Sequence, residues 1–485
     1  MNNNYMDKNT NTKVITRFAP SPTGFMHVGG IRTALYAYLW AKKNNGTFIL
    51  RIEDTDKARE VPGSIEHIMK ALKWMGLDWD EGPDIGGPNA PYKQSERLES
   101  YKKYAQILIK KGLAYADPYT EEEVEVFRKK ADEEKRPFLY REHRPDNPPI
   151  WDGSKPLRFK VPLIKRYEWN DLVFGNLSAG PEALDDFILI KSDGYPTYNF
   201  AHVIDDLEMQ ITHVMRGQEF ISSVPKYLSL YDALEIERPL FATLPPIMGK
   251  DGNKKLGKRD GAKDVLDYPK EGYLPEAMMN FLAFLGWNPG GEKEIYTKDE
   301  LINVFDISRI GHSGAQWNDD KLDWINKEYI KKLSTNELKD KIFEWLPEEL
   351  KIEKLISVIT ERISKFGDIK TMVDTGELDF YYKKPNYNKD KLTYKNSTET
   401  ALSNNLNNAV SSLSEIDEIN FNKETVKDSL NKIISATGIK SGEILHPVRF
   451  ALSGLDKSPD PFILSEILGK NETIERLNNA INFLK

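Results

Sequence analysis

Residues 13–56 read KVITRFAPSPTGFMHVGGIRTALYAYLWAKKNNGTFILRIEDTD and decide the fold. The β-type run of residues 13–18 stops at residues 20–24, where two prolines and a glycine exclude a regular element. A helix is predicted over residues 27–43, because apolar side chains recur there at helical spacing and an Asn-Asn-Gly sequence follows. The apolar run 48–52 indicates a second, buried strand. Strand, loop, helix and strand in this order predict a βαβ unit with a parallel sheet.

The pattern changes twice after this unit. Residues 116–190 hold a charged helix-like stretch, a proline-rich loop and short alternating strands, which is typical of an inserted α+β module. The parallel pattern resumes with an apolar strand at residues 211–215 and a helix at residues 222–234. Beyond residue 335 nearly every signal is helical and amphipathic, although the Asn- and Ser-rich residues 396–428 suggest loose loops.

Composition limits the class of protein. At 485 residues with 39% hydrophobic side chains, the chain can bury a large core, and no apolar run approaches the roughly 18 residues that span a membrane. The absence of cysteine excludes disulfides and cysteine-based zinc sites. A net charge of −7 argues weakly against a simple basic nucleic-acid binder. The polar, Asn-rich N-terminus lacks the apolar segment of a secretion signal, so we expect a frayed tail and a cytoplasmic protein.

Two glycine-containing segments suit phosphate binding. His27-Val28-Gly29-Gly30 lies at the predicted start of a helix, where free backbone N–H groups and the positive dipole end favour an anion. Lys255-Leu256-Gly257-Lys258-Arg259 forms a basic loop that could neutralise a triphosphate. Taken alone, the first is more often a glycine-rich turn and the second a solvated charged loop.

Charged residues follow the predicted strands, at the edge where open α/β sheets bind their ligands. The segment Arg51-Ile52-Glu53-Asp54-Thr55-Asp56 ends the second strand, and a carboxylate there could hold an ammonium group or Mg²⁺. Its carboxylates could instead cap the turn or pair with Arg51. Arg17 and Arg216 each lie near a strand end, and a guanidinium group pairs well with a carboxylate. Two converging arginines would select an acidic substrate. Two unrelated surface arginines are the commoner arrangement, and the sequence alone does not show that these two converge.

Together these segments resemble the class I aminoacyl-tRNA synthetases, and within them the bacterial glutamyl-tRNA synthetases. The match keeps the order and spacing of that family through Gly286 and is weaker in the helical remainder. It is carried by residues 16–24, 27–29, 51–56, 193–198, 216–219, 255–261 and 272–277.

The resemblance implies the fold class and a function for each segment. The fold would be α/β, with a Rossmann-type parallel-sheet catalytic domain, an inserted α+β acceptor-binding module and an all-α C-terminal anticodon-binding region. The implied boundaries are a disordered tail at 1–12, the catalytic domain at 13–115 and 191–250, the acceptor-stem module at 116–190, the KMSKS-type loop and stem-contact region at 251–330, and the anticodon region at 331–485.

The implied activity attaches L-glutamate to tRNA(Glu) with ATP and Mg²⁺, in a monomer. His27 and Lys258 would take part in catalysis, and Arg362 is a candidate anticodon reader. The implied ATP-binding residues are His27, Gly29, Gly30, Lys255, Lys258 and Arg259, and the implied glutamate-binding residues are Arg17, Ala19, Ser21, Glu53, Tyr198 and Arg216.

Three positions depart from the family pattern. Gly30 stands at the fourth HIGH-type position and Gly257 at the central serine of the KMSKS-type loop, so two side-chain contacts are missing. The region that holds a zinc-binding insertion in some relatives reads Tyr115-Ala116-Asp117-Pro118-Tyr119 here, so we expect no zinc.

Several alternatives stay open. A glutaminyl-tRNA synthetase is the nearest rival, and a non-discriminating enzyme would also charge tRNA(Gln). A glutamyl-queuosine synthetase would be shorter than this chain. A small-molecule nucleotidyltransferase would leave the inserted module and the helical region without a function, and a non-catalytic RNA-binding paralogue is the last alternative.

Overall fold

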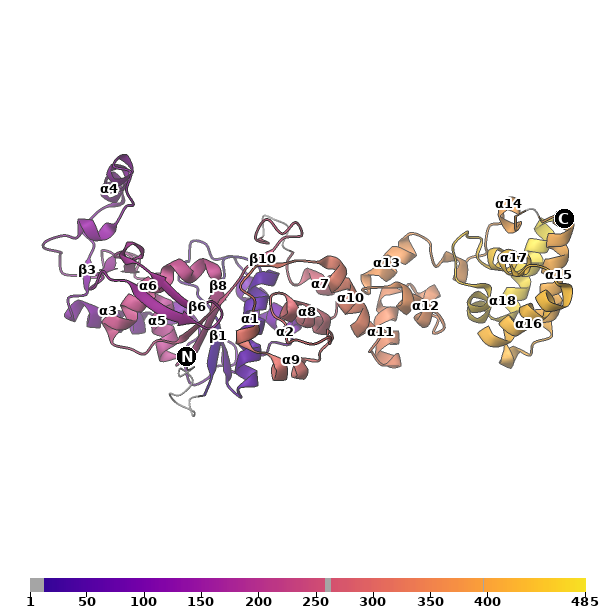
Figure 1. The fold of residues 1–485 in the computed structure, drawn as a ribbon, viewed down its shortest axis with the longest axis horizontal. Coiled ribbons are helices and arrows are strands. Elements are labelled where there is room, and N and C mark those ends of the chain that lie inside the picture. Colours follow the sequence, from indigo (N-terminus) through magenta and orange to yellow (C-terminus); the bar gives the residue numbers. More distant parts are fainter. Residues whose placement is uncertain (1–12, 258–262, 396) are drawn as a thin grey trace. The chain divides into compact units, whose positions relative to one another are not determined.

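The computed structural model describes residues 13–257, 263–395 and 397–485. The chain divides into two compact units (Figure 1). The first runs to Pro269 and includes Leu274–Ile325, and the second contains Lys270–Tyr273 and Asn326–Lys485. Within these described ranges no helix is both long and apolar enough to cross a membrane.

A six-stranded sheet forms the centre of the first unit. Its strands lie in the order β2-β1-β8-β9-β5-β6, and every neighbouring pair is parallel except β5–β6, which is antiparallel. Their bounds are β1 Ile15–Phe18, β2 Thr47–Leu50, β5 Tyr167–Asp171, β6 Gly175–Ala179, β8 His213–Gly217 and β9 Leu240–Leu244. The predicted parallel sheet is confirmed, and the carboxyl ends of its parallel strands meet at one edge.

The predicted βαβ unit is also confirmed. Helix α1 (Val28–Lys43) connects β1 to β2, which pair in parallel from Ile15–Thr47 to Phe18–Leu50. The side chains of β2 are all buried, as expected for a strand covered on both faces. Helix α1 packs against β1 and β2 and against α8 (Pro275–Phe284) and α9 (Lys298–Val304).

Further helices cover the sheet. Helices α3 (Leu98–Lys110), α5 (Tyr198–Glu208) and α6 (Val224–Leu234) pack on one another over a common apolar core. The sequence left α5 unassigned, and the strand predicted at residues 211–215 begins two residues later, at His213. The remaining elements are α2 Ser64–Trp74, α7 Asp267–Lys270, α10 Asp319–Ile330, and the short parallel pair β10 Ile247–Met248 and β11 Ala315–Gln316.

The region expected as an inserted module divides between two sheets. Strands β3 (Ala114–Ala116), β4 (Leu157–Phe159) and β7 (Ile188–Ile190) form a separate antiparallel sheet, and α4 (Glu121–Glu133) begins at a capping box. The hairpin β5–β6 lies within residues 116–190 but extends the main sheet beside β9. Sequence reasoning missed this hairpin because β6 has no fully buried residue and therefore shows no apolar run.

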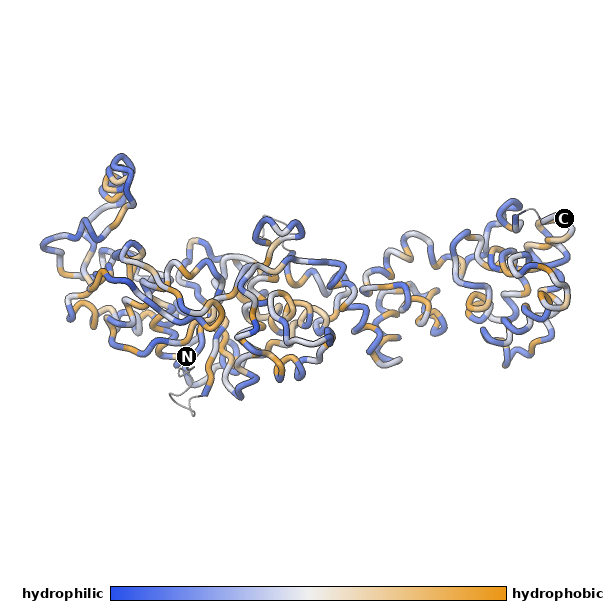
Figure 2. Tube along the Cα trace, in the orientation of Figure 1, coloured by the Kyte–Doolittle hydropathy of each residue, from blue (hydrophilic) through white to orange (hydrophobic). Residues whose placement is uncertain are grey.

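The second unit is helical. Its helices are α11 Thr335–Trp345, α12 Leu355–Arg362, α13 Gly367–Asp374, α14 Lys389–Leu392, α15 Glu399–Ser414, α16 Lys423–Thr437, α17 Ser441–Ser453 and α18 Pro461–Phe483. The loose loops expected at residues 396–428 were wrong, because α15 and the start of α16 occupy most of that stretch. Leu402, Leu406, Ala409 and Leu413 recur at helical spacing and are buried. Figure 2 shows such hydrophobic residues at intervals along these helices.

Candidate active site

His27 caps the N-terminus of α1. Its backbone is extended (φ −111°, ψ 167°), and its Nδ1 accepts a hydrogen bond of 3.1 Å from the Gly29 N–H group. In the neutral ring the proton therefore lies on Nε2, which makes that atom the donor. The first turn of α1 carries no acidic side chain. Backbone N–H groups, the positive dipole end and an imidazole donor thus coincide at one helix end, an arrangement suited to phosphate.

The two glycines after His27 leave no room for side chains. A methyl group at Gly30 would lie 2.5 Å from the sulfur of Met26, and one at Gly29 would lie 2.9 Å from Cε1 of His27. Met26 therefore occupies the space above Gly30. A side chain at the fourth position of the His27 segment would have to displace the flexible end of Met26.

Buried charges meet behind this turn, at the same edge of the sheet. Asp206, on α5, accepts hydrogen bonds from Nε of Arg17 at 3.1 Å and from Nη1 of Arg51 at 2.8 Å. Nη2 of Arg51 also donates to Glu53 at 3.1 Å. Burial alone would raise the pKa of Asp206, but Arg17 and Arg51 outweigh it and hold that pKa well below its usual range. Asp206 is therefore the anion that keeps both guanidinium groups in place.

Replacing Asp206 by Asn is expected to lower the free energy of unfolding by about 3–5 kcal/mol, because two buried cations lose their shared partner. Urea denaturation monitored by circular dichroism measures the change. Glu99→Gln, which breaks an exposed ion pair with Lys102 on α3, is the matched control and should change stability by less than about 1 kcal/mol. Equal effects of the two substitutions would contradict a structural role for Asp206.

Arg216 differs from its neighbour Arg17 because no carboxylate pairs with it in the described residues. Its side chain is 7% exposed, and Nη1 is buried without a hydrogen-bond partner there. The guanidinium group lies 4.7 Å from the ring centre of Tyr227 and 5.5 Å from that of Phe220. Nη1 of Arg17 donates to the carbonyl of Met215, the residue before Arg216, at 3.3 Å, and the charges of both arginines act on Tyr198 and His202. A buried, unpaired guanidinium group is costly unless a ligand supplies the missing anion.

Tyr198 and His202, both on α5, lie close enough to Arg216 for its charge to act on them. Tyr198 begins α5, and burial raises the pKa of its hydroxyl, which therefore remains a donor. His202, one turn later, is 1% exposed and has no hydrogen-bond partner for either ring nitrogen within the described chain. Burial and then Arg216 hold the pKa of His202 well below its usual range, so the ring is neutral. Sequence reasoning missed His202, and only its position four residues after Tyr198 on a helix could have indicated it.

Glu53 lies beside the loop that follows β1. Its backbone N–H donates to the carbonyl of Pro20 at 3.0 Å, which places the half-buried Ala19 and the exposed Ser21 on the adjoining turn. Burial raises the pKa of Glu53 to about 7, against the pull of Arg51 and Arg17. The carboxyl group is therefore only partly ionised near pH 7, and a bound cation would favour its ionised form.

Only part of the predicted basic loop can be placed. Lys255 forms an ion pair of 3.1 Å with Glu219, which follows Arg216 by three residues. Lys258 and Arg259 lie outside the described residues. The structure therefore brings Lys255 to the same strand end as Arg216.

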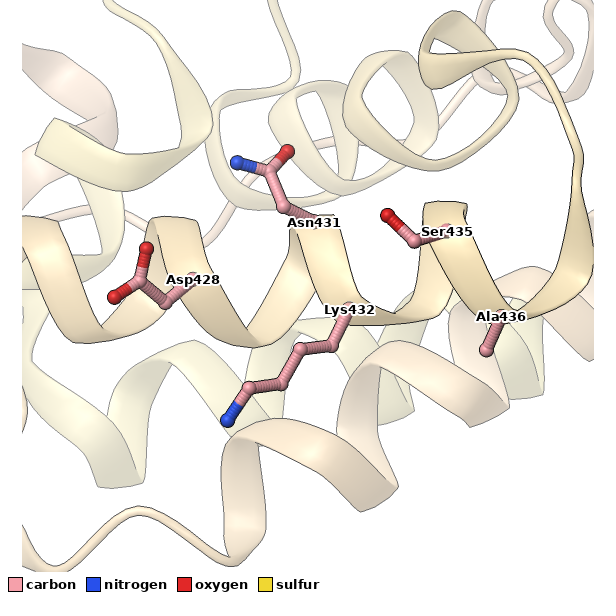
Figure 3. Close-up of a pocket in the computed structure, with 5 residues that line it drawn as sticks. All are labelled: Asp428, Asn431, Lys432, Ser435 and Ala436. Atoms are coloured by element: carbon pink, nitrogen blue, oxygen red, sulfur yellow. The ribbon is translucent and has the colours of Figure 1, made fainter.

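The second unit offers surface features of a different kind. Arg362, at the end of α12, is half-exposed and forms an ion pair of 2.9 Å with Glu377. A shallow hollow of about 600 Å³ lies along α16, and Figure 3 shows its lining of Asp428, Asn431, Lys432, Ser435 and Ala436. Most of the buried ionisable groups lie in the first unit.

Comparisons with known proteins show the family of this chain. The catalytic domain of tRNA synthetases class I (E and Q) matches residues 13–324, and an anticodon binding domain matches residues 316–481. The glutamate–tRNA ligase of Clostridium botulinum strain Okra is 42% identical, over 98% of this chain and 99% of the relative. This chain belongs to the glutamate–tRNA ligase family. The ligase of Clostridium tetani is 41% identical over 98% of each chain.

Solved structures of the same ligase family are also similar. A glutamate–tRNA ligase from Elizabethkingia meningosepticum, in complex with its amino acid, has a TM-score of 0.87 and 37% identity, over 98% of this chain and 100% of that one. The enzyme from Elizabethkingia anophelis has a TM-score of 0.85 and 36% identity, over 97% and 100% of the two chains. The ligase resemblance read from the sequence is thus confirmed along the whole chain.

Proposed function

We propose that this chain attaches L-glutamate to tRNA(Glu) in two steps. Glutamate and ATP first form glutamyl-adenylate and pyrophosphate, and the terminal adenosine of the tRNA then accepts the glutamyl group. One observation carries the choice of substrate. Among the residues that the structure describes, no carboxylate forms an ion pair with the buried Arg216, which lies at the sheet edge where His27 caps α1. A carboxylate ligand would supply the missing charge.

Each pocket residue has a proposed role in holding glutamate. Arg216 and the Tyr198 hydroxyl bind the side-chain carboxylate, and Arg17, already neutralised by Asp206, adds a further N–H group. Glu53 binds the α-ammonium group, while Ala19 and Ser21 line the turn beside it. Neutral glutamine would leave the charge of Arg216 uncompensated, and the site should therefore reject it.

The nucleotide would lie across the N-terminus of α1. His27 donates from Nε2 to the phosphates, and Gly29 and Gly30 allow the backbone to approach them. Lys255, Lys258 and Arg259 are proposed to neutralise the triphosphate. Mg²⁺ generally accompanies ATP in this family and would be held by the phosphates. The protein's contribution is positioning and charge stabilisation.

Contacts with tRNA are proposed for the rest of the chain. The β3-β4-β7 module would hold the acceptor end and the helical unit the anticodon, with Arg362 as a candidate reader. We propose a zinc-free module, because Arg158 and the Tyr140 hydroxyl both bind Asp117 at the position where some relatives use cysteines. A cytoplasmic monomer is part of the same proposal.

Pyrophosphate exchange tests the function directly. With tRNA(Glu) and glutamate present, exchange into ATP is expected, and glutamine should not support it. Aminoacylation of purified tRNA(Glu) and tRNA(Gln) then decides between a discriminating and a non-discriminating enzyme. Exchange that occurs equally well with glutamine, or with no amino acid, would overturn the assignment of substrate.

The activity should depend on pH through Glu53. Its pKa near 7 means that the free protein binds a proton there at acidic pH, when the carboxyl group cannot pair with an ammonium ion. The kcat/KM for glutamate is therefore expected to fall about tenfold per pH unit below 7 and to level off above it. The free energy of unfolding should change with pH in the opposite direction. Because the pKa of Glu53 is higher in the folded protein than in the unfolded chain, its contribution to stability is fully present below the unfolded pKa and is lost as pH rises through 7.

The measurement is the pH profile of pyrophosphate exchange between pH 5.5 and 8.5. Glu53→Gln, which cannot ionise, should have a low and flat profile over the same range. A profile that keeps its slope in Glu53→Gln would assign the titration to another group.

A further inference from the structure

His67 contacts two segments that lie far apart in the sequence. From α2, its Nδ1 accepts a hydrogen bond of 3.4 Å from the Met26 N–H group, and its Nε2 lies 2.8 Å from Oδ2 of Asp264. The ring of Phe25 stacks on it at 4.6 Å between centres. A single neutral tautomer fits both contacts, because Nδ1 must accept and Nε2–H must donate. His67 thus joins the residue before His27 to Asp264.

Asp264 holds its own segment against the same turn. Its Oδ1 accepts from the Leu266 N–H group at 2.9 Å, so both carboxylate oxygens have partners. His27 and Asp264 form an antiparallel β-bridge, and the N–H group of Val265 donates to the carbonyl of Met26 at 3.0 Å. Val265 is buried. Residues 264–265 therefore lie alongside residues 26–27.

Met26 is consequently fixed at three points. Its N–H group bonds to His67, its carbonyl accepts from Val265, and its sulfur fills the space over Gly30. The next residue, His27, has the extended backbone that aims its ring across the first turn of α1. A shift of Met26 would move the His27 ring away from the position where it can meet a phosphate.

We propose that His67 and Asp264 are positioning residues for His27 in the ATP-dependent step. They touch no substrate themselves, and their effect passes through the backbone of Met26 and the β-bridge to His27. This inference rests on the proposed role of His27. Loss of either contact should weaken the use of ATP while leaving the use of glutamate unchanged, since the Arg216 pocket is built from other elements.

Steady-state pyrophosphate exchange on the full chain, with tRNA present, tests the pair. His67→Phe keeps the stacking on Phe25 but removes both hydrogen bonds, and kcat/KM for ATP should fall about 3- to 10-fold with KM for glutamate unchanged. His67→Gln can reach Asp264 and His67→Asn can reach Met26, so each should recover part of the loss. Asp264→Asn keeps the contact between His67 and Met26 and one acceptor oxygen, and should therefore cause a smaller loss than His67→Phe. Lys73 lies on the same helix as His67, and Lys73→Gln, which breaks its exposed ion pair with Asp84, should have no effect.

A double variant with His27→Ala distinguishes the positioning role of His67 from the proposed role of His27 itself. If His67 acts through His27, adding His67→Phe to His27→Ala should cause no further loss, because coupled residues are not additive. Full multiplicative loss in the double variant, or equal effects on ATP and glutamate, would overturn the positioning role. If His27→Ala alone leaves exchange unchanged, the proposed function of His27 fails instead. A melting temperature for every variant shows that it is folded.

Discussion

Replacing Arg216 by Gln is expected to lower kcat/KM for glutamate by roughly 10²- to 10³-fold, the scale on which an unpaired buried charge is penalised. In the variant, the side-chain carboxylate of glutamate would enter a buried site without its counter-ion. Discrimination against glutamine should shrink at the same time, because the charge that rejects a neutral amide has gone. Pyrophosphate exchange with each amino acid measures both effects.

The same substitution should leave the melting temperature unchanged or raise it. Arg216 is buried without a carboxylate partner in the described chain, and its neutral replacement removes a desolvation cost from the folded state. Asp206→Asn is expected to do the reverse, because Asp206 already serves two cations. Arg216 would thus increase the activity toward glutamate while it lowers the stability of the folded protein.

Arg238→Gln provides the control for Arg216→Gln. Arg238 pairs with Asp232 on the surface of the same unit and should tolerate the change in both assays. An Arg216→Gln protein that binds glutamate with unaltered KM would show that the acidic substrate is held elsewhere. A large loss of stability would show that Arg216 is paired in the folded protein.

Replacing His27 by Ala is expected to slow adenylate formation by about 10²- to 10³-fold, which is typical for the loss of one preorganised donor. The Nε2–H group meets the phosphates only if Nδ1 remains the acceptor from Gly29. Single-turnover measurement of pyrophosphate release isolates this step. The KM for glutamate should change little.

A second variant separates catalysis from helix capping. Asn is a good N-cap residue, so His27→Asn should keep the first turn of α1 stable while it removes the imidazole donor. Adenylate formation as slow in His27→Asn as in His27→Ala, with a melting temperature like that of the original protein, would support the donor role. Full activity in His27→Asn would limit His27 to capping.

Local patterns in the sequence were sufficient for the first βαβ unit. Apolar residues at helical spacing, followed by Asn-Asn-Gly, indicated α1, and a short apolar run indicated the fully buried β2. The same method failed at residues 396–428, where asparagines and serines on the exposed face of α15 outnumber its buried leucines. It also missed α5, whose buried polar residues belong to the site.

The amino-acid sequence was enough to predict the parallel α/β architecture, the helical C-terminal region and, from the order of its motifs, the family. Which of the charged side chains form ion pairs became clear from the folded chain alone. In the sequence, Arg17 and Arg216 each lie near the end of a predicted strand. In the folded chain, Asp206 on α5 pairs with Arg17, whereas Arg216 lies among aromatic rings. Electrostatic pairing depends on distances of a few ångströms between segments nearly 200 residues apart, and no local pattern encodes such distances.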